Sequence, residues 1–189
     1  MIINATFGIT KTPFMAPRPA LLPQQERIAD YLKTHSQHGG FSVIVGEPGV
    51  GKTVLRETIE SLENPHDTAV ASFSRTLHTY RQILHQLADA LKVEPTANHL
   101  EKNLITAAEA AARKKQTLFV LIDEAHLLDI HNLRRLRLLF DRFPKQHNLV
   151  LFGQPDLMTR LRLLVNRDIR DRIGLAFSWA FIHPCSRQR

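Results

Sequence analysis

The sequence has little cysteine, few aromatic residues and no long apolar run. Cys185 is the only cysteine, so no intrachain disulfide can form, which fits a reducing cytoplasm. No apolar stretch approaches the ~20 residues of a membrane span. The start, MIINATFGIT, lacks the charged and apolar regions of a signal peptide. We therefore expect a cytoplasmic protein with no membrane segment. Aromatic residues make up only 7% of the chain, which argues against base stacking as a main binding mode.

Acidic residues are too few to balance the basic ones. The chain has 25 Lys and Arg residues against 18 Asp and Glu residues, which gives a formal net charge of +7 and a pI of about 10.0. Such an excess attracts polyanions and supports non-specific binding to nucleic acid. The alternative is a soluble protein that is basic without such a partner. With 189 residues, 43% of them apolar, the chain is long enough for one domain with its own core.

Short apolar runs alternate with helical patterns along most of the chain. Strands are predicted at Phe41–Val45, Thr68–Phe73, Leu118–Ile122, Asn148–Phe152 and Leu175–Phe181. Helices are predicted over about 23–38, 52–62, 76–92, 101–115, 131–143 and 156–164. Because strands alternate with helices and hairpin signals are absent, the strands are expected to pair in parallel. The pattern predicts an α/β three-layer sandwich with a five-stranded parallel sheet, preceded by a proline-rich arm.

A glycine-rich segment follows the first predicted strand. GEPGVGKT, residues 46–53, matches the pattern G-x-x-x-x-G-K-[ST] and opens a predicted helix. The glycines let backbone N–H groups turn toward phosphate oxygens, and the helix points its positive end to the same place. Lys52 is expected to contact the β- and γ-phosphates, and Thr53 to offer its hydroxyl to Mg²⁺. The residues expected to bind ATP are Gly46, Glu47, Pro48, Gly49, Val50, Gly51, Lys52, Thr53 and Val54.

Two carboxylates follow the third predicted strand. Asp123 and Glu124 come directly after the apolar run, and ligands of parallel sheets bind beyond the carboxyl ends of the strands. Asp123 is expected to hold Mg²⁺ through water, and Glu124 to polarise the attacking water as a general base. The alternative is that Asp123 only caps the next helix. The strand and two helices that separate this pair from the glycine-rich segment favour the catalytic interpretation.

Two further residues are candidates to assist the reaction. Gln154 follows the fourth predicted strand, where its amide is placed to sense the γ-phosphate or orient the water. The alternative is an exposed glutamine in a turn. Arg172 precedes the fifth predicted strand and is a candidate arginine finger for the nucleotide of a neighbouring subunit. The alternative is the solvated basic end of a helix.

The helix expected over 131–143 carries basic residues opposite its apolar stripe. Asp141 lies four residues from Arg137, and the two are expected to pair. A solvated helix face is the alternative interpretation. Because these basic residues add to the positive net charge, we favour contact between this protein and the phosphates of double-stranded DNA. The candidate basic residues are Arg134, Arg135, Arg137, Arg142, Lys145, Arg160 and Arg162.

Four segments together resemble the core of AAA+ ATPases. They are GEPGVGKT, LFVLIDEAH, LVLFGQPDL and DIRDRIGLAF, in that order along the chain. More narrowly they resemble the ExeA-like group, which includes transposition ATPases similar to TnsC, TniB and MuB, and FGITKTPF (residues 7–14) resembles that group's opening segment. The resemblance implies a Mg·ATP-hydrolysing P-loop protein with Gln154 as sensor 1 and Arg172 as the finger. It also implies rings or filaments, and an arm near the adenine.

The resemblance divides the chain into an N-terminal arm (residues 1–22), an AAA+ core (23–183) and a tail (184–189). The final FIHPCSRQR does not resemble the start of the group's helical lid, so we expect the lid to be absent. DEAH, residues 123–126, does not indicate a two-lobed helicase, because no sequence remains for a second lobe, and His126 is expected to pack or cap.

The site residues and the resemblance together give three candidate functions. The first is a DNA-binding regulator of transposition that acts as an ATP-dependent homo-oligomer with a transposase. The second is an ExeA-like secretion-assembly ATPase, and the third is a nucleotide-binding module with little turnover.

Overall fold

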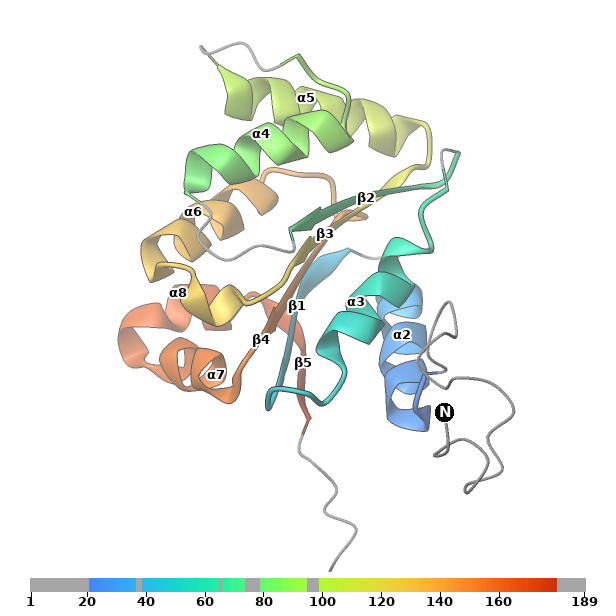
Figure 1. Cartoon of the computed structure of the whole chain (residues 1–189). Helices are drawn as coiled ribbons and strands as arrows, with labels where there is room; N and C mark the ends of the chain where they lie inside the picture. Colours follow the sequence, from blue (N-terminus) through green and yellow to red (C-terminus); the bar gives the residue numbers. More distant parts are fainter. Residues whose placement is uncertain (1–20, 37–38, 65, 74–78, 95–98, 180–189) are drawn as a thin grey trace, which may run out of the picture.

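The computed structural model describes residues 21–36, 39–64, 66–73, 79–94 and 99–179, which form a three-layer α/β fold (Figure 1). Five parallel strands make the middle layer in the order β2-β3-β4-β1-β5. The prediction of a five-stranded parallel sheet is therefore confirmed. The strands are β1 (Gly40–Gly46), β2 (Thr68–Phe73), β3 (Thr117–Ile122), β4 (Asn148–Gly153) and β5 (Ile173–Trp179).

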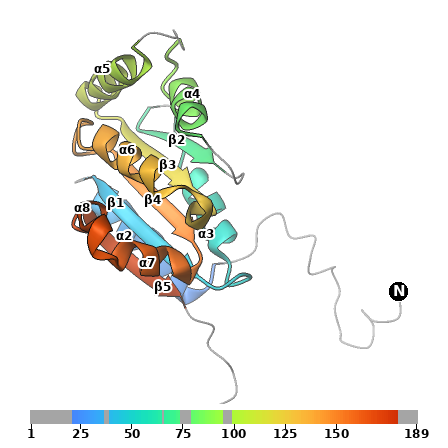
Figure 2. The same ribbon diagram turned by 90° about the vertical axis from the view of Figure 1, so that its left-hand side faces the viewer.

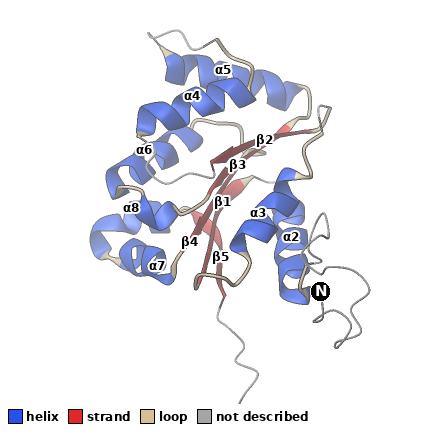
Figure 3. Ribbon diagram, in the orientation of Figure 1, coloured by secondary structure: helices blue, strands red, loops and turns tan. Residues whose placement is uncertain are grey.

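Helices cover both faces of the sheet (Figures 1, 2 and 3). One face carries α2 (Pro23–Ser36) and α3 (Lys52–Glu60). The other face carries α4 (Tyr80–Ala90), α5 (Leu100–Arg113), α6 (Ile130–Phe140), α7 (Pro155–Arg162) and α8 (Arg167–Arg170). Two short 3₁₀ turns, η2 (Ala125–Leu127) and η3 (Leu164–Asn166), link these elements. Among the described helices, none combines the length and the apolar character needed to cross a bilayer.

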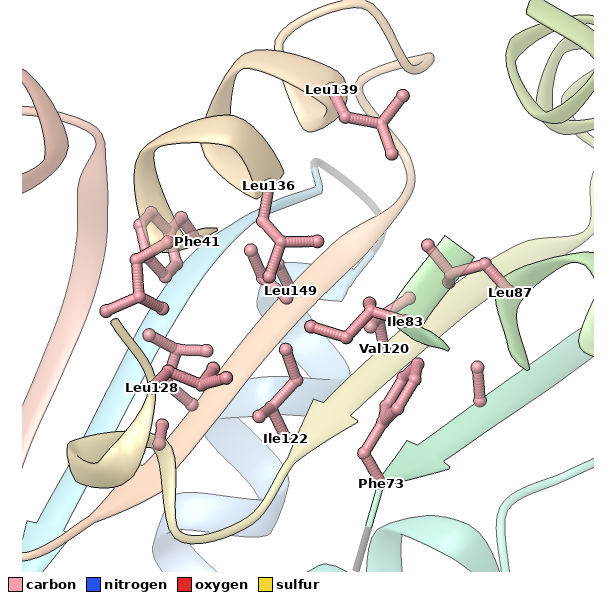
Figure 4. Packing of buried hydrophobic residues seen from close by; sticks show 14 of the residues in the cluster. Phe41, Phe73, Ile83, Leu87, Val120, Ile122, Leu128, Leu136, Leu139 and Leu149 are labelled. Atoms are coloured by element: carbon pink, nitrogen blue, oxygen red, sulfur yellow. The ribbon is translucent and has the colours of Figure 1, made fainter. Parts of the chain in front are cut away.

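The central strands are apolar on both sides because both sides are covered. Val43 and Leu151 point into the core under α4–α8, and Ile44 and Val150 point into the core under α2 and α3. All four side chains are 0% exposed. Figure 4 shows the larger core, where residues of α6 lie over the strands. Burying each such side chain stabilises the fold by roughly 1.5–3 kcal/mol.

Element boundaries differ from the sequence prediction at a few places. The described part of the helix expected over 76–92 begins at Tyr80, after a capping box in which Thr79 and Gln82 bond each other's backbone N–H groups. β5 begins at Ile173, two residues before the predicted start. Its pairing with Phe41 of β1 accounts for this extension. Residues 1–20 of the expected arm and the whole expected tail, with Cys185, lie outside the described residues.

A buried histidine fastens α5 to the sheet. The backbone N–H of Leu118 donates to Nδ1 of His147 over 3.1 Å, so the ring proton is on Nε2 and donates to Ala108 O over 2.9 Å. His147 is 3% exposed. Burial lowers the pKa of His147 below its usual value, while the bond to Ala108 opposes that shift. The neutral ring is therefore part of the folded structure.

This arrangement predicts loss of stability in mild acid. The folded pKa of His147 lies below the unfolded value, so the unfolded chain takes the proton first, and stability present above about pH 6.5 falls as the pH drops further. The slope for this one group is at most about 1.4 kcal/mol per pH unit. Urea unfolding at pH 7.5 and 5.5 should show a smaller pH effect in His147→Gln than in the wild type. His66→Gln, at an exposed histidine, should keep the wild-type pH effect.

Candidate functional site

The carboxyl ends of β1, β3 and β4 bring the predicted site segments to one edge of the sheet (Figure 1). β4 lies between β3 and β1, with Val45 of β1 opposite Gly153 and Ile122 of β3 opposite Leu151. The loop after β1, the carboxylates after β3 and Gln154 after β4 therefore leave the sheet side by side. This is the edge at which ligands of open parallel sheets bind.

The loop between β1 and α3 curls around the ammonium group of Lys52. Its Nζ donates to the carbonyl oxygens of Gly46, over 2.7 Å, and Glu47, over 2.9 Å. Gly49 and Gly51 have φ angles of 84° and 92°, which L residues with a side chain rarely adopt. No side chain caps α3, and its first turn has no acidic residue, so its N–H groups are left for an anion. The curled loop and the free N–H groups of the first turn of α3 form a cradle suited to an anion.

Burial makes Lys52 easier to deprotonate than an ordinary lysine. Lys52 is 7% exposed, and desolvation lowers the pKa of its ammonium group. The negative charges of Glu124, Asp123 and Glu47 act in the opposite direction. Added phosphate charge at this edge would act in the same direction as the carboxylates and favour the charged ammonium.

Asp123 and Glu124 leave β3 in a constrained turn. Asp123 is 8% exposed, and its Oδ1 accepts a hydrogen bond from the backbone N–H of Glu124 over 2.9 Å. Glu124 has a φ of 51°, an uncommon angle for a residue with a side chain. Its Oε2 lies 3.5 Å from Nε2 of His126, and its side chain is 39% exposed. The N-terminus of α6 is capped by Asp129, so Asp123 is not the cap of that helix.

Two buried residues at this edge carried no recognised sequence signal. Gln25, in the first turn of α2, donates to Gly51 O over 3.3 Å and accepts from Leu22 N over 2.7 Å. Arg56 of α3 places Nε 3.3 Å from Oδ2 of Asp123. Arg56 also contacts Glu60, four residues later in the same helix. The contacts from Gln25 to Gly51 and from Arg56 to Asp123 join segments far apart in the chain, so periodicity does not reveal them.

Gln154 lies where the sequence predicted it, directly after β4. It occupies the N-cap position of α7, but its side chain does not cap that helix. Farther along α7, Arg160 donates to the backbone oxygens of His126 and Leu128, the latter over 2.9 Å. This bond pair fixes the turn after Glu124. Arg160 was one of the candidate basic residues for DNA contact, and the structure shows its guanidinium bonded to these backbone oxygens.

Arg172 is not brought to this edge. It precedes β5, whose Ile173 lies opposite Phe41 near the start of β1, so Arg172 lies at the other end of the sheet. β1 has 7 residues, which corresponds to a separation of roughly 20 Å from the loop. Its Nε is 3.6 Å from Asp141 Oδ1, and its side chain is 58% exposed. Arg172 therefore has no contact with the loop after β1 or with the carboxylates after β3 in its own chain.

The basic face of α6 is largely engaged within the protein. Arg137 pairs with Asp141 over 3.0 Å, as the spacing predicted. Arg134 binds Asp168 over 2.9 Å and lowers the pKa of that carboxyl. Arg135 lies over the ring of Tyr80, 3.7 Å from its centroid. These three arginines are therefore partly engaged by groups of this chain, and the simple solvated face considered as the alternative does not describe them.

The donor set at the edge fits Mg²⁺ bound with phosphate. Among the residues that the structure describes, no three His, Cys, Asp or Glu side chains gather into a metal site. Mg²⁺ in phosphate sites keeps several waters and takes only one or two protein oxygens besides those of the phosphates. Thr53, an exposed residue at the start of α3, and Asp123 at the end of β3 supply such oxygens.

The loop geometry predicts that a methyl group at residue 51 is destabilising. Gly51→Ala would place Cβ 2.4 Å from Nε2 of the buried Gln25, at a φ of 92°. We expect the free energy of unfolding to fall by about 1–3 kcal/mol, measured by urea unfolding. Gly40→Ala is the matched control, since its Cβ would meet no atom within 4 Å. Equal stability of the two variants would contradict the described loop conformation.

Several solved structures share this fold. The chain superposes on Aeropyrum pernix ORC2 in its ADPNP–ADP complexes with a TM-score of 0.65 and 13% identity, covering 90% of this chain and 50% of that one. Pyrobaculum aerophilum Cdc6p superposes with a TM-score of 0.61 and 18% identity, covering 93% of this chain and 48% of that one. Aeropyrum pernix ORC1 in complex with DNA superposes with a TM-score of 0.58 and 17% identity, covering 85% of this chain and 46% of that one. The present chain therefore spans about half the length of these proteins, and the likeness establishes the fold alone.

A search of curated proteins finds no match. A family model described as "AAA domain" matches residues 34–161, which include the glycine-rich loop, both carboxylates after β3 and Gln154. That match spans more than half of the chain. With the sheet order and the loop geometry, it establishes that this chain belongs to the AAA domain family.

Proposed function

We propose that this chain binds Mg·ATP and hydrolyses it to ADP and phosphate. The observation that carries the proposal is the buried Lys52 ammonium, which the loop carbonyls hold beside Asp123 and Glu124. The backbone of residues 46–54 is the proposed seat of the phosphates. Lys52 would neutralise phosphate charge there. A nucleoside triphosphate that is to be hydrolysed is the ligand that needs the phosphate loop, the ammonium and the two carboxylates together.

Each remaining residue has a distinct proposed role. Thr53 and Asp123 would hold Mg²⁺, which when bound offsets charge on the phosphate oxygens. Glu124 is the proposed general base, because its half-exposed carboxylate lies just beyond the metal-binding Asp123 and can accept a proton from water. Gln154 is proposed to contact the γ-phosphate from the next strand.

The proposal extends to an assembly of several copies. Arg172 is remote from its own nucleotide edge and exposed, as a finger acting on a neighbouring copy would need to be. We propose that ATP favours this homo-oligomer. The core would span residues 23–183, with 1–22 as an arm and 184–189 as a tail.

Double-stranded DNA is the proposed partner of this assembly. The net charge of +7 supports it. Arg142, Lys145 and Arg162 are exposed and make no ion pair among the described residues. Aeropyrum pernix ORC1, which shares the fold, is bound to DNA in its structure. We favour regulation of a transposase, because the motifs resemble those of TnsC, TniB and MuB. The same motifs also resemble ExeA, so a secretion ATPase is the alternative.

Two substitutions test the nucleotide proposal. Lys52→Ala should abolish binding of a fluorescent ATP analogue, because the ammonium contributes the central positive charge of the cradle. Glu124→Gln should keep that binding but lower steady-state ATP turnover by about 10²–10⁴-fold, since the amide cannot accept the proton. Glu109→Gln, on the exposed side of α5, is the control and should change neither value. Full turnover by Glu124→Gln would exclude Glu124 as the base, and unchanged affinity in Lys52→Ala would exclude the cradle.

Fluorescence anisotropy of a random-sequence duplex tests the DNA proposal. Binding should require ATP and weaken steeply between low and moderate salt, because phosphate contacts release counterions. The double substitution Arg142→Gln and Lys145→Gln should reduce the slope of log affinity against log salt by up to about 2. Arg167→Gln, which removes a cation already paired with Asp171 over 3.1 Å, is the control. Absence of binding at low salt with ATP would favour the secretion-type alternative.

A further inference from the structure

Arg56 is a buried arginine for which the proposed reaction has no role. It lies in the second turn of α3, four residues after Lys52, and is 8% exposed. A guanidinium is rarely buried unless its charge is paired, because removal from water is costly. The partners of Arg56 therefore indicate what it does.

The guanidinium joins three elements of the nucleotide edge. Its Nη1 donates to Oγ of Ser72 in β2 over 2.8 Å and also bonds the carboxylate of Glu60. Its Nε lies 3.3 Å from Oδ2 of Asp123, the side chain proposed to hold Mg²⁺. Because Oδ1 of Asp123 already accepts from the backbone of Glu124, both oxygens of this carboxylate have a partner inside the protein.

Arg56 is the cation that lies against the carboxylate of Asp123, while Lys52 is turned toward the loop carbonyls. A free divalent cation would therefore meet an Asp123 carboxylate already paired with a guanidinium, and it would have to displace that charge. A cation that arrives with a polyphosphate brings its own negative charge, which the Lys52 cradle attracts.

We propose that Arg56 is a positioning residue that shields Asp123, so that Mg²⁺ enters the site together with a nucleotide and not alone. This inference rests on the proposed nucleotide site and adds the order in which its two ligands bind. The same guanidinium fixes the orientation of Asp123 until the phosphates supply the charge that draws the metal in.

Binding of Mn²⁺ without nucleotide tests the inference directly. Mn²⁺ is the probe because its free concentration is read by electron paramagnetic resonance. The wild type should bind it weakly. Arg56→Met removes the shielding charge and should tighten Mn²⁺ binding about tenfold or more. Arg56→Lys keeps the charge and should bind Mn²⁺ as weakly as the wild type does. Arg81→Met, which removes an exposed positive charge on α4, controls for net charge and should have no effect.

A second substitution locates the metal. Adding Asp123→Asn to Arg56→Met should abolish the gain, because the carboxylate that Arg56 no longer pairs with is the expected ligand. Retention of the gain in that double variant would overturn the inference, as would equal Mn²⁺ affinity of Arg56→Met and the wild type. The inference also fails if Arg56→Lys gains as much as Arg56→Met, since charge would then not be the cause. Circular dichroism reports whether each variant folds. Arg56→Gln, which keeps a donor for Ser72, replaces Arg56→Met if the latter is unfolded, with the same expected gain.

Nucleotide binding is measured separately on the wild type with a fluorescent ADP analogue. A wild type that binds no nucleotide would refute the proposed function, whereas the Mn²⁺ titrations would still report on Arg56 and Asp123. With nucleotide present, Mg²⁺ should strengthen ADP binding more in the wild type than in Arg56→Met. The reason is that Mg²⁺ binds the variant without nucleotide, so the presence of ADP adds less to its metal affinity and, by linkage, Mg²⁺ adds less to its ADP affinity.

Discussion

The buried ammonium of Lys52 is the group on which the geometry of the nucleotide edge depends. A positive charge withdrawn from water needs oxygen partners, and the loop supplies the carbonyls of Gly46 and Glu47. To place both carbonyls there, the backbone must turn back on itself, which requires the left-handed angles of Gly49 and Gly51. Gln25 then holds the loop from the side of α2. The curl of the loop thus depends on the ammonium of Lys52, on the two glycines and on Gln25.

Three arginines join elements of this protein that are distant in the sequence. Arg160 holds the turn after Glu124 through backbone oxygens, and Arg56 ties α3 to β2 and β3. Arg134 links α6 to the segment around Asp168. A planar guanidinium offers five N–H donors in a fixed fork, so it can satisfy groups from different elements at once. The high pI thus overstates the positive charge that is available to an external partner.

The sequence predicted the fold well because its signals are local. Apolar runs such as Leu118–Ile122 and glycine-rich turns report on neighbouring residues, and the resulting strands agree with β1 to β5 within a few residues. The cradle and the carboxylates after β3 were predicted because a motif defines them. Arg56 and Gln25 were not, since their roles arise only where α2, α3 and β3 meet. The contacts of the α6 arginines were missed for the same reason: spacing revealed the partner within the helix, Asp141, but not Asp168 or Tyr80.

The position of β1 in the sheet determines when the cradle can form. β1 is made early in synthesis, yet both of its neighbours, β4 and β5, are made more than a hundred residues later. Long-range parallel pairing closes large loops and is slow, so β1 must wait unpaired while the intervening helices emerge. The loop after β1 acquires its shape only when that pairing is complete. The shape of this loop is therefore a property of the complete sheet and not of the local sequence alone.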